Sequence, residues 1–464
     1  MLILASACVP FGDAYAGSGD LDPVFGSGGI TIVDFTPLST APGTVGSPST
    51  DLDPRGRTWG AATVVGVGTR GLGLTRLTRD GQLDPTFGTL GIRYTASDQP
   101  ASFQFDALRV DRDGHAYVTY EDGDPTVWHV CRLAEDGSID VSYFDAGCAA
   151  VPMPITNFRA LVVNPVDGNV WLLGSAAHTG SLLLEPAVVE IDTATHSVRS
   201  ARIPVAGANV DIRAATFSST GVLFVTGAYA TIGANRDAFA GSITRAGNGF
   251  SFQLLGSVSY NVGATLADVG RCIALTASDK VQIGVAIEAG GGAIEWGSAR
   301  FSAPDTLDPG YGIGGKTAEV IASSQYAVSN DESAIAGCVA QRDGGFTLAG
   351  NHRFADPAAA DQPGAAFALH RLRSDGTADQ SFGGDLALPG VGYSLAFAGT
   401  AIDYLRSAAS AKPRRDIALS ISKVPHSGAV IVSGVSLRPG SLSNPQDLVI
   451  VRVLGDEIFD ATQE

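Results

Sequence analysis

The sequence predicts an all-β fold, a single seven-bladed β-propeller of four-stranded antiparallel blades that is closed by its N-terminal strand. Two repeating patterns along the 464 residues lead to this prediction. One is a strand end followed by two turns and an aromatic residue, and the other is a tight turn followed by a strand that ends in small residues. A helical spacing of apolar residues is missing almost throughout, so an all-β class is favoured.

The first pattern is complete at Arg76–Gly91. Asp80-Gly81 between two apolar runs indicates a hairpin turn, because glycine accepts the positive φ that such a turn needs. Asp84 can accept hydrogen bonds from nearby backbone N–H groups, Pro85 fixes φ, and Phe87 supplies a large apolar face. Copies recur roughly every 50 to 70 residues, which is typical of propellers and solenoids. They lie at 19–26, 132–144, 300–312 and 371–383, with eroded copies at 189–192 and 242–247.

The second pattern gives the number of blades. Its seven turns lie at 55–56, 113–114, 167–168, 220–221, 279–280, 343–344 and 427–428. Six blades are therefore expected near 50–95, 101–155, 156–205, 206–260, 265–320 and 330–390. The last begins near Asp416 and ends at 449–454, where its aromatic copy is missing and Asp20–Phe35 can replace it. Pairing of this N-terminal segment with the last blade would remove exposed sheet edges.

These residues resemble the bacterial delta-60 repeat, whose features are a basic-Leu strand end, Asp-Gly, Leu-Asp and Phe-Gly. The resemblance covers most of residues 20–460 and is specific in four copies. It implies a propeller-like fold and a secreted or cell-surface location. It implies no activity, because members of that family are mostly uncharacterised.

The composition limits the classes of partner. Lys and Arg number 30 against 47 Asp and Glu, so the formal net charge is −17. Non-specific binding of nucleic acid is not expected, because phosphate neutralisation needs basic patches. Charged residues are 17% and hydrophobic ones 45%, which predicts a large core. No run of about 18 apolar residues is present, so we predict no transmembrane helix, and we expect a monomer.

The N-terminus predicts export from a bacterial cell, to the periplasm, the outer surface or the medium. Residues Met1–Ala16 are short and apolar and end in Ala14-Tyr15-Ala16, as a secretory signal peptide does. Residues 17–464 would then form the single propeller domain. The basic n-region is missing, which a start upstream of Met1 would explain. A frayed tail and a lipoprotein cleavage site at Leu4–Cys8 are the alternatives.

Four cysteines remain if Cys8 leaves with the signal, and an even number in an exported chain indicates disulfides. Cys131 and Cys148 flank one Asp-Gly turn, so their bond would bridge a hairpin. Cys272 and Cys338 take the same repeat position in successive blades, so their bond would link neighbouring inner strands. Buried free thiols are the alternative for each pair. Cys-x-x-Cys spacing is absent, so we predict no zinc site.

Three arginines form the candidate binding site. The innermost strand of each blade should precede the Asp-Gly-type turn, and equivalent positions on these strands converge on the ring axis. Arg159, Arg213 and Arg271 align on three consecutive blades; the other strands align at Asp106, Gly337 and Asp416. Guanidinium groups suit carboxylate or sulfate recognition, so an acidic glycan or a peptide carboxylate is the expected ligand. The alternative is that these arginines pair with Asp106, Asp416 or backbone carbonyls and only tie blades together.

No motif predicts a catalytic residue, a cofactor or a metal. Gly66–Gly71 matches a dinucleotide fingerprint, but the strand at 72–77 offers no helix N-terminus for phosphate. The acidic turns at 111–114 and 121–124 lack the spacing of a calcium loop, and the seven histidines are dispersed. We therefore predict a non-enzymatic binding or surface-interaction module with a protein or glycan partner. Two rivals stay open: a lyase or hydrolase with a residue such as His370 or His426 near a carboxylate at the channel mouth, and a purely structural repeat of a surface assembly.

Overall fold

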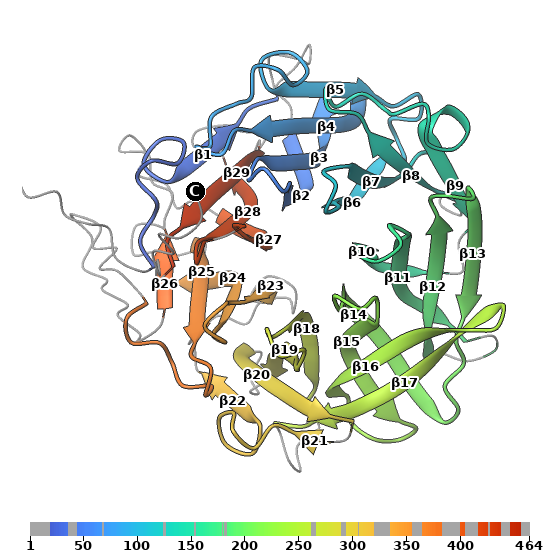
Figure 1. The fold of residues 1–464 in the computed structure, drawn as a ribbon, viewed down its shortest axis with the longest axis vertical. Coiled ribbons are helices and arrows are strands. Elements are labelled where there is room, and N and C mark those ends of the chain that lie inside the picture. The colour runs from blue at the N-terminus through green and yellow to red at the C-terminus, as the bar shows by residue number, and fades with distance from the viewer. Residues whose placement is uncertain are drawn as a thin grey trace, which may run out of the picture.

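The computed structural model is a ring of seven sheets around a central axis, as Figure 1 shows. It describes residues 19–35, 44–66, 69–123, 127–152, 155–178, 180, 183–260, 266–288, 294–304, 306–319, 335–354, 364–382, 400–403, 416–425, 427–437 and 446–455. The predicted seven-bladed fold is confirmed. The predicted signal segment Met1–Ala16 lies outside the described residues. Within them, no helix is long and apolar enough to span a bilayer.

The seven blades follow the chain in order. Blade 1 holds β2 (Thr44–Leu52), β3 (Thr58–Gly66), β4 (Thr69–Leu77) and β5 (Ile92–Ala96), and blade 2 holds β6 (Gln104–Val110), β7 (Ala116–Glu121), β8 (Val127–Leu133) and β9 (Cys148–Pro152). Blade 3 holds β10 (Asn157–Val163), β11 (Val170–Ala177), β12 (Leu184–Asp192) and β13 (Ser197–Arg202). Blade 4 holds β14 (Ala208–Phe217), β15 (Leu223–Thr231), β16 (Asp237–Ala246) and β17 (Gly249–Val258).

The later blades keep the same antiparallel order. Blade 5 holds β18 (Asp268–Leu275), β19 (Val281–Glu288), β20 (Ile294–Ala303), β21 (Thr306–Leu307) and β22 (Lys316–Glu319), and blade 6 holds β23 (Ile335–Ala340), β24 (Phe346–Phe354), β25 (Gly364–Leu372) and β26 (Thr400–Asp403). Blade 7 holds β27 (Asp416–Lys423), β28 (Val430–Leu437) and β29 (Gln446–Val453), with β1 (Ile30–Val33) as its outer strand.

The N-terminal segment completes blade 7. Strand β1 pairs antiparallel with β29, so that Ile30 lies opposite Val451 and Val33 opposite Leu448. Two backbone hydrogen bonds continue the pairing, from the Gly19 N–H to the Leu454 carbonyl and from the Leu454 N–H to the Asp20 carbonyl. The two ends of the described chain therefore meet in one sheet.

The core lies between the blades and not within them. Each sheet turns one apolar face to the sheet before it and the other to the sheet after it, as the two-residue period of a strand allows. Leu173 and Val188 of blade 3, for example, belong to one buried cluster with Val210 and Val225 of blade 4. A single blade can cover neither face by itself, so each blade depends on its neighbours for its core.

An ion pair explains why the complete repeats begin with arginine. In each of them the arginine pairs with the aspartate that follows Leu, Ile or Ala in the second turn, and its guanidinium lies over the aromatic ring that ends the repeat. The nitrogen Nε is 2.6–3.2 Å from the carboxylate in Arg76–Asp84, Arg132–Asp140, Arg300–Asp308, Arg371–Asp379 and Arg452–Asp22. The rings are Phe87, Tyr143, Tyr311, Phe382 and Phe25, at 4.4–5.9 Å from the guanidinium carbon. We call this arrangement the latch.

The latch also joins consecutive blades. The guanidinium of Arg76 in blade 1 reaches the carboxylate and the backbone carbonyl of Glu135 in blade 2. The Asp-Gly turn of blade 2 then lies on the aromatic ring of blade 1, where a Cβ at Gly137 would come within 2.4 Å of Phe87. Gly137 has a φ of +80°, so both the turn and the ring contact require glycine here.

The eroded copies keep the contact with reversed charges. Glu190 of β12 occupies the position opposite Trp171 that Arg76 occupies opposite Trp59. Its partner is Arg245 of blade 4, which also lies 2.9 Å from Asp167 and stacks over Trp171. The junction between blades 3 and 4 is therefore held by an acidic group facing a basic one, in the opposite order to the junction between blades 1 and 2.

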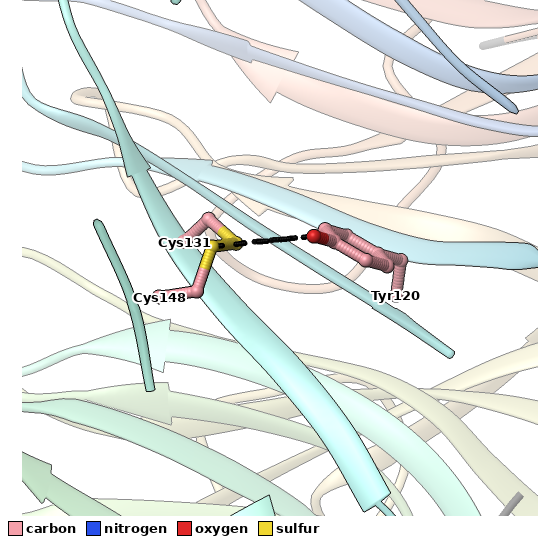
Figure 2. The surroundings of a disulfide bond; sticks show 3 residues. All are labelled: Tyr120, Cys131 and Cys148. Carbon is pink, nitrogen blue, oxygen red and sulfur yellow. Dashed lines mark hydrogen bonds between the residues drawn. A yellow bond between two sulfur atoms is a disulfide. The ribbon is translucent and has the colours of Figure 1, made fainter. Parts of the chain in front are cut away.

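Both predicted disulfides are confirmed. Cys131 and Cys148 face each other on β8 and β9 and bridge one hairpin, with the Tyr120 hydroxyl 3.6 Å from the Cys131 sulfur (Figure 2). Cys272 and Cys338 join β18 to β23, the inner strands of blades 5 and 6. Disulfides of this kind persist in oxidising compartments, which fits an exported protein.

Candidate functional site

A cavity of about 980 Å³ lies on the axis of the ring. Residues of all seven inner strands line it, from β2, β6, β10, β14, β18, β23 and β27. Figure 1 shows these strands facing one another across the centre. The prediction that the strand before each Asp-Gly-type turn is innermost is therefore confirmed.

Every inner strand shifts register against the second strand of its blade at one level of the ring. The extra residues are Asp106, Arg159, Arg213, Arg271, Ala336 and Leu419, and Ser47 with Pro48 in blade 1. All of them line the cavity. Side chains of a regular strand alternate between the two faces of a blade, whereas a bulge redirects one of them. We call Pro48, Asp106, Arg159, Arg213, Arg271, Ala336 and Leu419 the bulge ring.

Polar side chains of the preceding blade fix several bulges. The residue just before the bulge donates its backbone N–H to such a side chain. Phe105 donates to Thr63 Oγ1, Ile212 to Ser175 Oγ and Ala418 to Asn351 Oδ1, at 2.6–2.9 Å. A bulge frees backbone groups from the strand ladder, and a buried free N–H is costly. At these three junctions the second strand therefore holds the bulge of the next blade in place.

The three predicted arginines take equivalent positions on consecutive blades, as expected. Arg159 is exposed, and Arg213 and Arg271 are half-buried. The Arg213 guanidinium donates from Nε to Asp211 Oδ2 at 2.9 Å, and Nη2 lies 2.6 Å from the same oxygen. Asp211 is itself held by the Ser175 hydroxyl at 3.2 Å. The predicted alternative named Asp106, Asp416 or backbone carbonyls as partners, and Asp211 was missed.

The alignment of the other blades was partly wrong. Ala336, and not Gly337, is the bulged residue of blade 6, and Leu419, and not Asp416, is that of blade 7. Asp416 instead pairs with Ser436 at the beginning of β27. Cys272 and Cys338 are consequently one residue out of equivalence, although they lie close enough to bond.

Asp106 precedes the three arginines in the bulge ring and has an unusual carboxyl group. Burial, together with the charge of Glu121, raises its pKa from 3.8 to about 7, although a hydrogen bond with Gln104 opposes the shift. Oxygen Oδ2 is buried without a hydrogen bond among the described residues. This carboxyl group therefore takes up its proton at a much higher pH than an ordinary aspartate.

A pH-dependent stability follows from Asp106. Its carboxyl binds a proton more tightly in the folded than in the unfolded chain, so the stability should fall as pH rises from about 4 through 7. An Asp106→Asn variant cannot ionise there. From pH 5 to pH 8 the urea midpoint of the wild type should fall relative to that of the variant. A difference between the two midpoints that does not change with pH would contradict the raised pKa of Asp106.

The acidic turn residues lie where the inner strands leave the cavity. Asp111 accepts hydrogen bonds from the backbone N–H groups of Asp113 and His115, at 2.9 and 2.8 Å, and so closes its own turn. No group of three or more His, Cys, Asp and Glu side chains that would suit a metal ion is found in the part of the chain that the structure describes.

The alternative of a lyase or hydrolase requires a residue such as His370 or His426 near a carboxylate at the channel mouth. No histidine or tyrosine is found among the described residues that line the cavity. His370 lies buried on β25, the third strand of blade 6, away from the axis. His426 lies outside the described residues.

One family model and several solved structures are similar to this chain. The family model described as a domain of unknown function (DUF5122) beta-propeller matches residues 60–87, which end at Phe87 of the first complete repeat. No curated protein matches the chain. A protein of unknown function from Dyadobacter fermentans DSM 18053 is 11% identical, with 92% of this chain and 99% of that chain covered and a TM-score of 0.41.

Two further solved structures are similar over most of their length. The β-propeller domain of the Trilobed protease from Pyrococcus furiosus is 8% identical, with 91% and 99% of the chains covered and a TM-score of 0.44. The α-L-arabinanase of Penicillium chrysogenum is 10% identical, with 76% and 93% covered and a TM-score of 0.42.

Proposed function

We propose that this protein is an exported, non-enzymatic binding propeller that recognises an anionic ligand in its central cavity through Arg159, Arg213 and Arg271. The observation that carries the proposal is the position of these residues. They occupy the bulge of three consecutive inner strands and line the same cavity. We call these three residues the arginine arc. Their positive charges are unusual in a chain whose formal net charge is −17.

The chemistry of the arc is that of recognition. Guanidinium groups stay charged throughout the physiological pH range and present up to five N–H donors in a rigid fork, which fits carboxylate and sulfate oxygens. They are poor general acids or bases for the same reason. An acidic glycan or the carboxylate of a protein partner is therefore the ligand that we propose, with the protein acting as a monomer and binding no nucleic acid.

The bulges provide the preorganisation that binding needs. Asp211 and Ser175 hold Arg213 and its bulge through a chain of hydrogen bonds, so little side-chain freedom is lost when a ligand arrives. The two disulfides stiffen blade 2 and the junction of blades 5 and 6 on either side of the arc.

Titration calorimetry with acidic oligosaccharides, and with neutral oligosaccharides of equal length, tests the proposal. The Arg159→Ala/Arg213→Ala/Arg271→Ala variant should lose at least about tenfold in affinity for the anions, since one hydrogen bond to a charged group contributes about 1.5–3 kcal/mol. Arg199→Ala is the matched control, because Arg199 is exposed on the outer strand β13. Anion binding that survives in the triple variant would refute the proposal.

A further inference from the structure

We infer that the ligand is an amphipathic carboxylate, in which an anionic group is joined to a hydrocarbon part that crosses the cavity. This inference rests on the proposed function, since it takes the arginine arc as the anion site, and it narrows the proposed ligands to carboxylates with a hydrocarbon part, which sets the acidic glycan aside. It adds a second subsite, formed by the apolar members of the bulge ring.

The bulge ring is divided into a charged and an uncharged part. Blades 2 to 5 contribute Asp106, Arg159, Arg213 and Arg271 in unbroken order. Blades 6, 7 and 1 contribute the uncharged residues Ala336, Leu419 and Pro48, with the polar Ser47 beside Pro48. All seven lie at the same level, because the bulge of each inner strand is at the same register position, and all seven line the cavity. The ring therefore offers opposite chemistries on its two sides.

The geometry of a seven-membered ring sets the two subsites across from each other. In such a ring blade 7 faces the junction of blades 3 and 4, and Figure 1 shows β27 across the axis from β10 and β14. Leu419 of β27 is consequently opposite Arg159 and Arg213. Its side chain is 39% exposed, which makes it an apolar group left uncovered inside the cavity.

A wholly polar ligand would use only half of this ring. Sugar hydroxyls placed against the Leu419 and Ala336 side chains would lose hydrogen bonds to water without gaining partners from these two side chains. A hydrocarbon group would instead remove the exposed leucine from water. Each buried CH₂ group raises the affinity about fourfold. The cavity of about 980 Å³ lies at the upper end of the range for small-molecule sites, so it has room for both parts of the ligand.

The experiment is a calorimetric titration with acetate, butyrate, hexanoate and octanoate, compared with galacturonate and with hexanol. Affinity should rise about fourfold per added CH₂ group, and hexanol should bind more weakly than hexanoate. Leu419→Gln should flatten the rise with chain length, as should Ala336→Gln on the adjacent blade. Ile232→Gln is the matched control, since Ile232 is exposed next to the end of β15, outside the cavity lining.

The outcomes separate the two proposals. Galacturonate and acetate binding as tightly as octanoate, with no effect of Leu419→Gln, would overturn the amphipathic ligand and leave the anion site standing. Equal binding of all carboxylates by the wild type and by the triple arginine variant would overturn both. Octanoate binding that depends on Leu419 and on the arginines together is the result that supports the inference.

Discussion

Replacing Arg452 with alanine should lower the free energy of unfolding by about 3–5 kcal/mol, the range for removing one member of a buried ion pair. Its Nε lies 2.6 Å from Asp22, and its guanidinium lies over Phe25 and donates to the Arg79 carbonyl of blade 1. The two charged side chains are only 11% and 9% exposed. Alanine would leave the Asp22 carboxylate buried without its counter-charge, at the place where the ring closes.

Arg132→Ala is the comparison for this variant. Arg132 forms the same latch with Asp140, but within one continuous segment and with both side chains more than a fifth exposed. We expect it to cost less, because solvent screens the pair and no distant segment is released. Both variants are unfolded in guanidinium chloride with their disulfides intact, and their midpoints are compared. A double-mutant cycle of Arg452→Ala, Asp22→Ala and the combined variant then gives the coupling energy between Arg452 and Asp22. An Arg452 variant no less stable than the Arg132 variant would show that the split latch does not hold the ring closed.

Removing the Cys272–Cys338 bond should cost about 4 kcal/mol, and removing the Cys131–Cys148 bond about 3 kcal/mol, because a crosslink that closes a longer loop restricts the unfolded chain more. The two loops span 66 and 17 residues. The first bond also joins two blades, whereas the second lies within one hairpin.

Paired Cys→Ser variants unfolded in urea without reductant measure this difference. The Cys272→Ser/Cys338→Ser protein should have the lower midpoint, and reduction of the wild type should bring it to or below that of either variant. A larger loss from the Cys131–Cys148 pair would indicate that the hairpin, and not the junction of blades 5 and 6, limits stability.

The fold could be predicted because its signals are local and repeated. Each Asp-Gly turn and each buried aromatic residue indicates its own conformation, and seven copies fix the count. The disulfides followed from the same repeat, since Cys131 and Cys148 flank one turn and Cys272 and Cys338 recur in adjacent blades. The latch was missed, although arginine and aspartate stand eight residues apart in Arg76–Asp84. The sequence predicts that Asp84 accepts from backbone N–H groups, and its other oxygen, Oδ1, does accept from the Thr86 N–H.

The bulge ring was predicted in blades 2 to 5 and missed elsewhere for a physical reason. A bulge inserts one residue and so breaks the alternation of the strand, and its distance from the turn glycine is not constant. Arg159 and Leu419 stand nine residues before Gly168 and Gly428. Pro48, Asp106 and Ala336 each stand eight residues before the glycines Gly56, Gly114 and Gly344. Asp211 stands two residues before Arg213, and their contact depends on the bulge, so the alternation of a regular strand does not predict it.

The division of one latch between Asp22 and Arg452, 430 residues apart, also sets a waiting time during synthesis. A ribosome adds about 5–20 residues per second, so about 20–90 seconds pass between the two partners leaving it. Throughout that interval the strand at Ile30–Val33 lacks its partner strand β29, while blades 1 to 6 can already pack against one another. The nascent chain is therefore an open arc whose first blade keeps one apolar face uncovered until blade 7 forms.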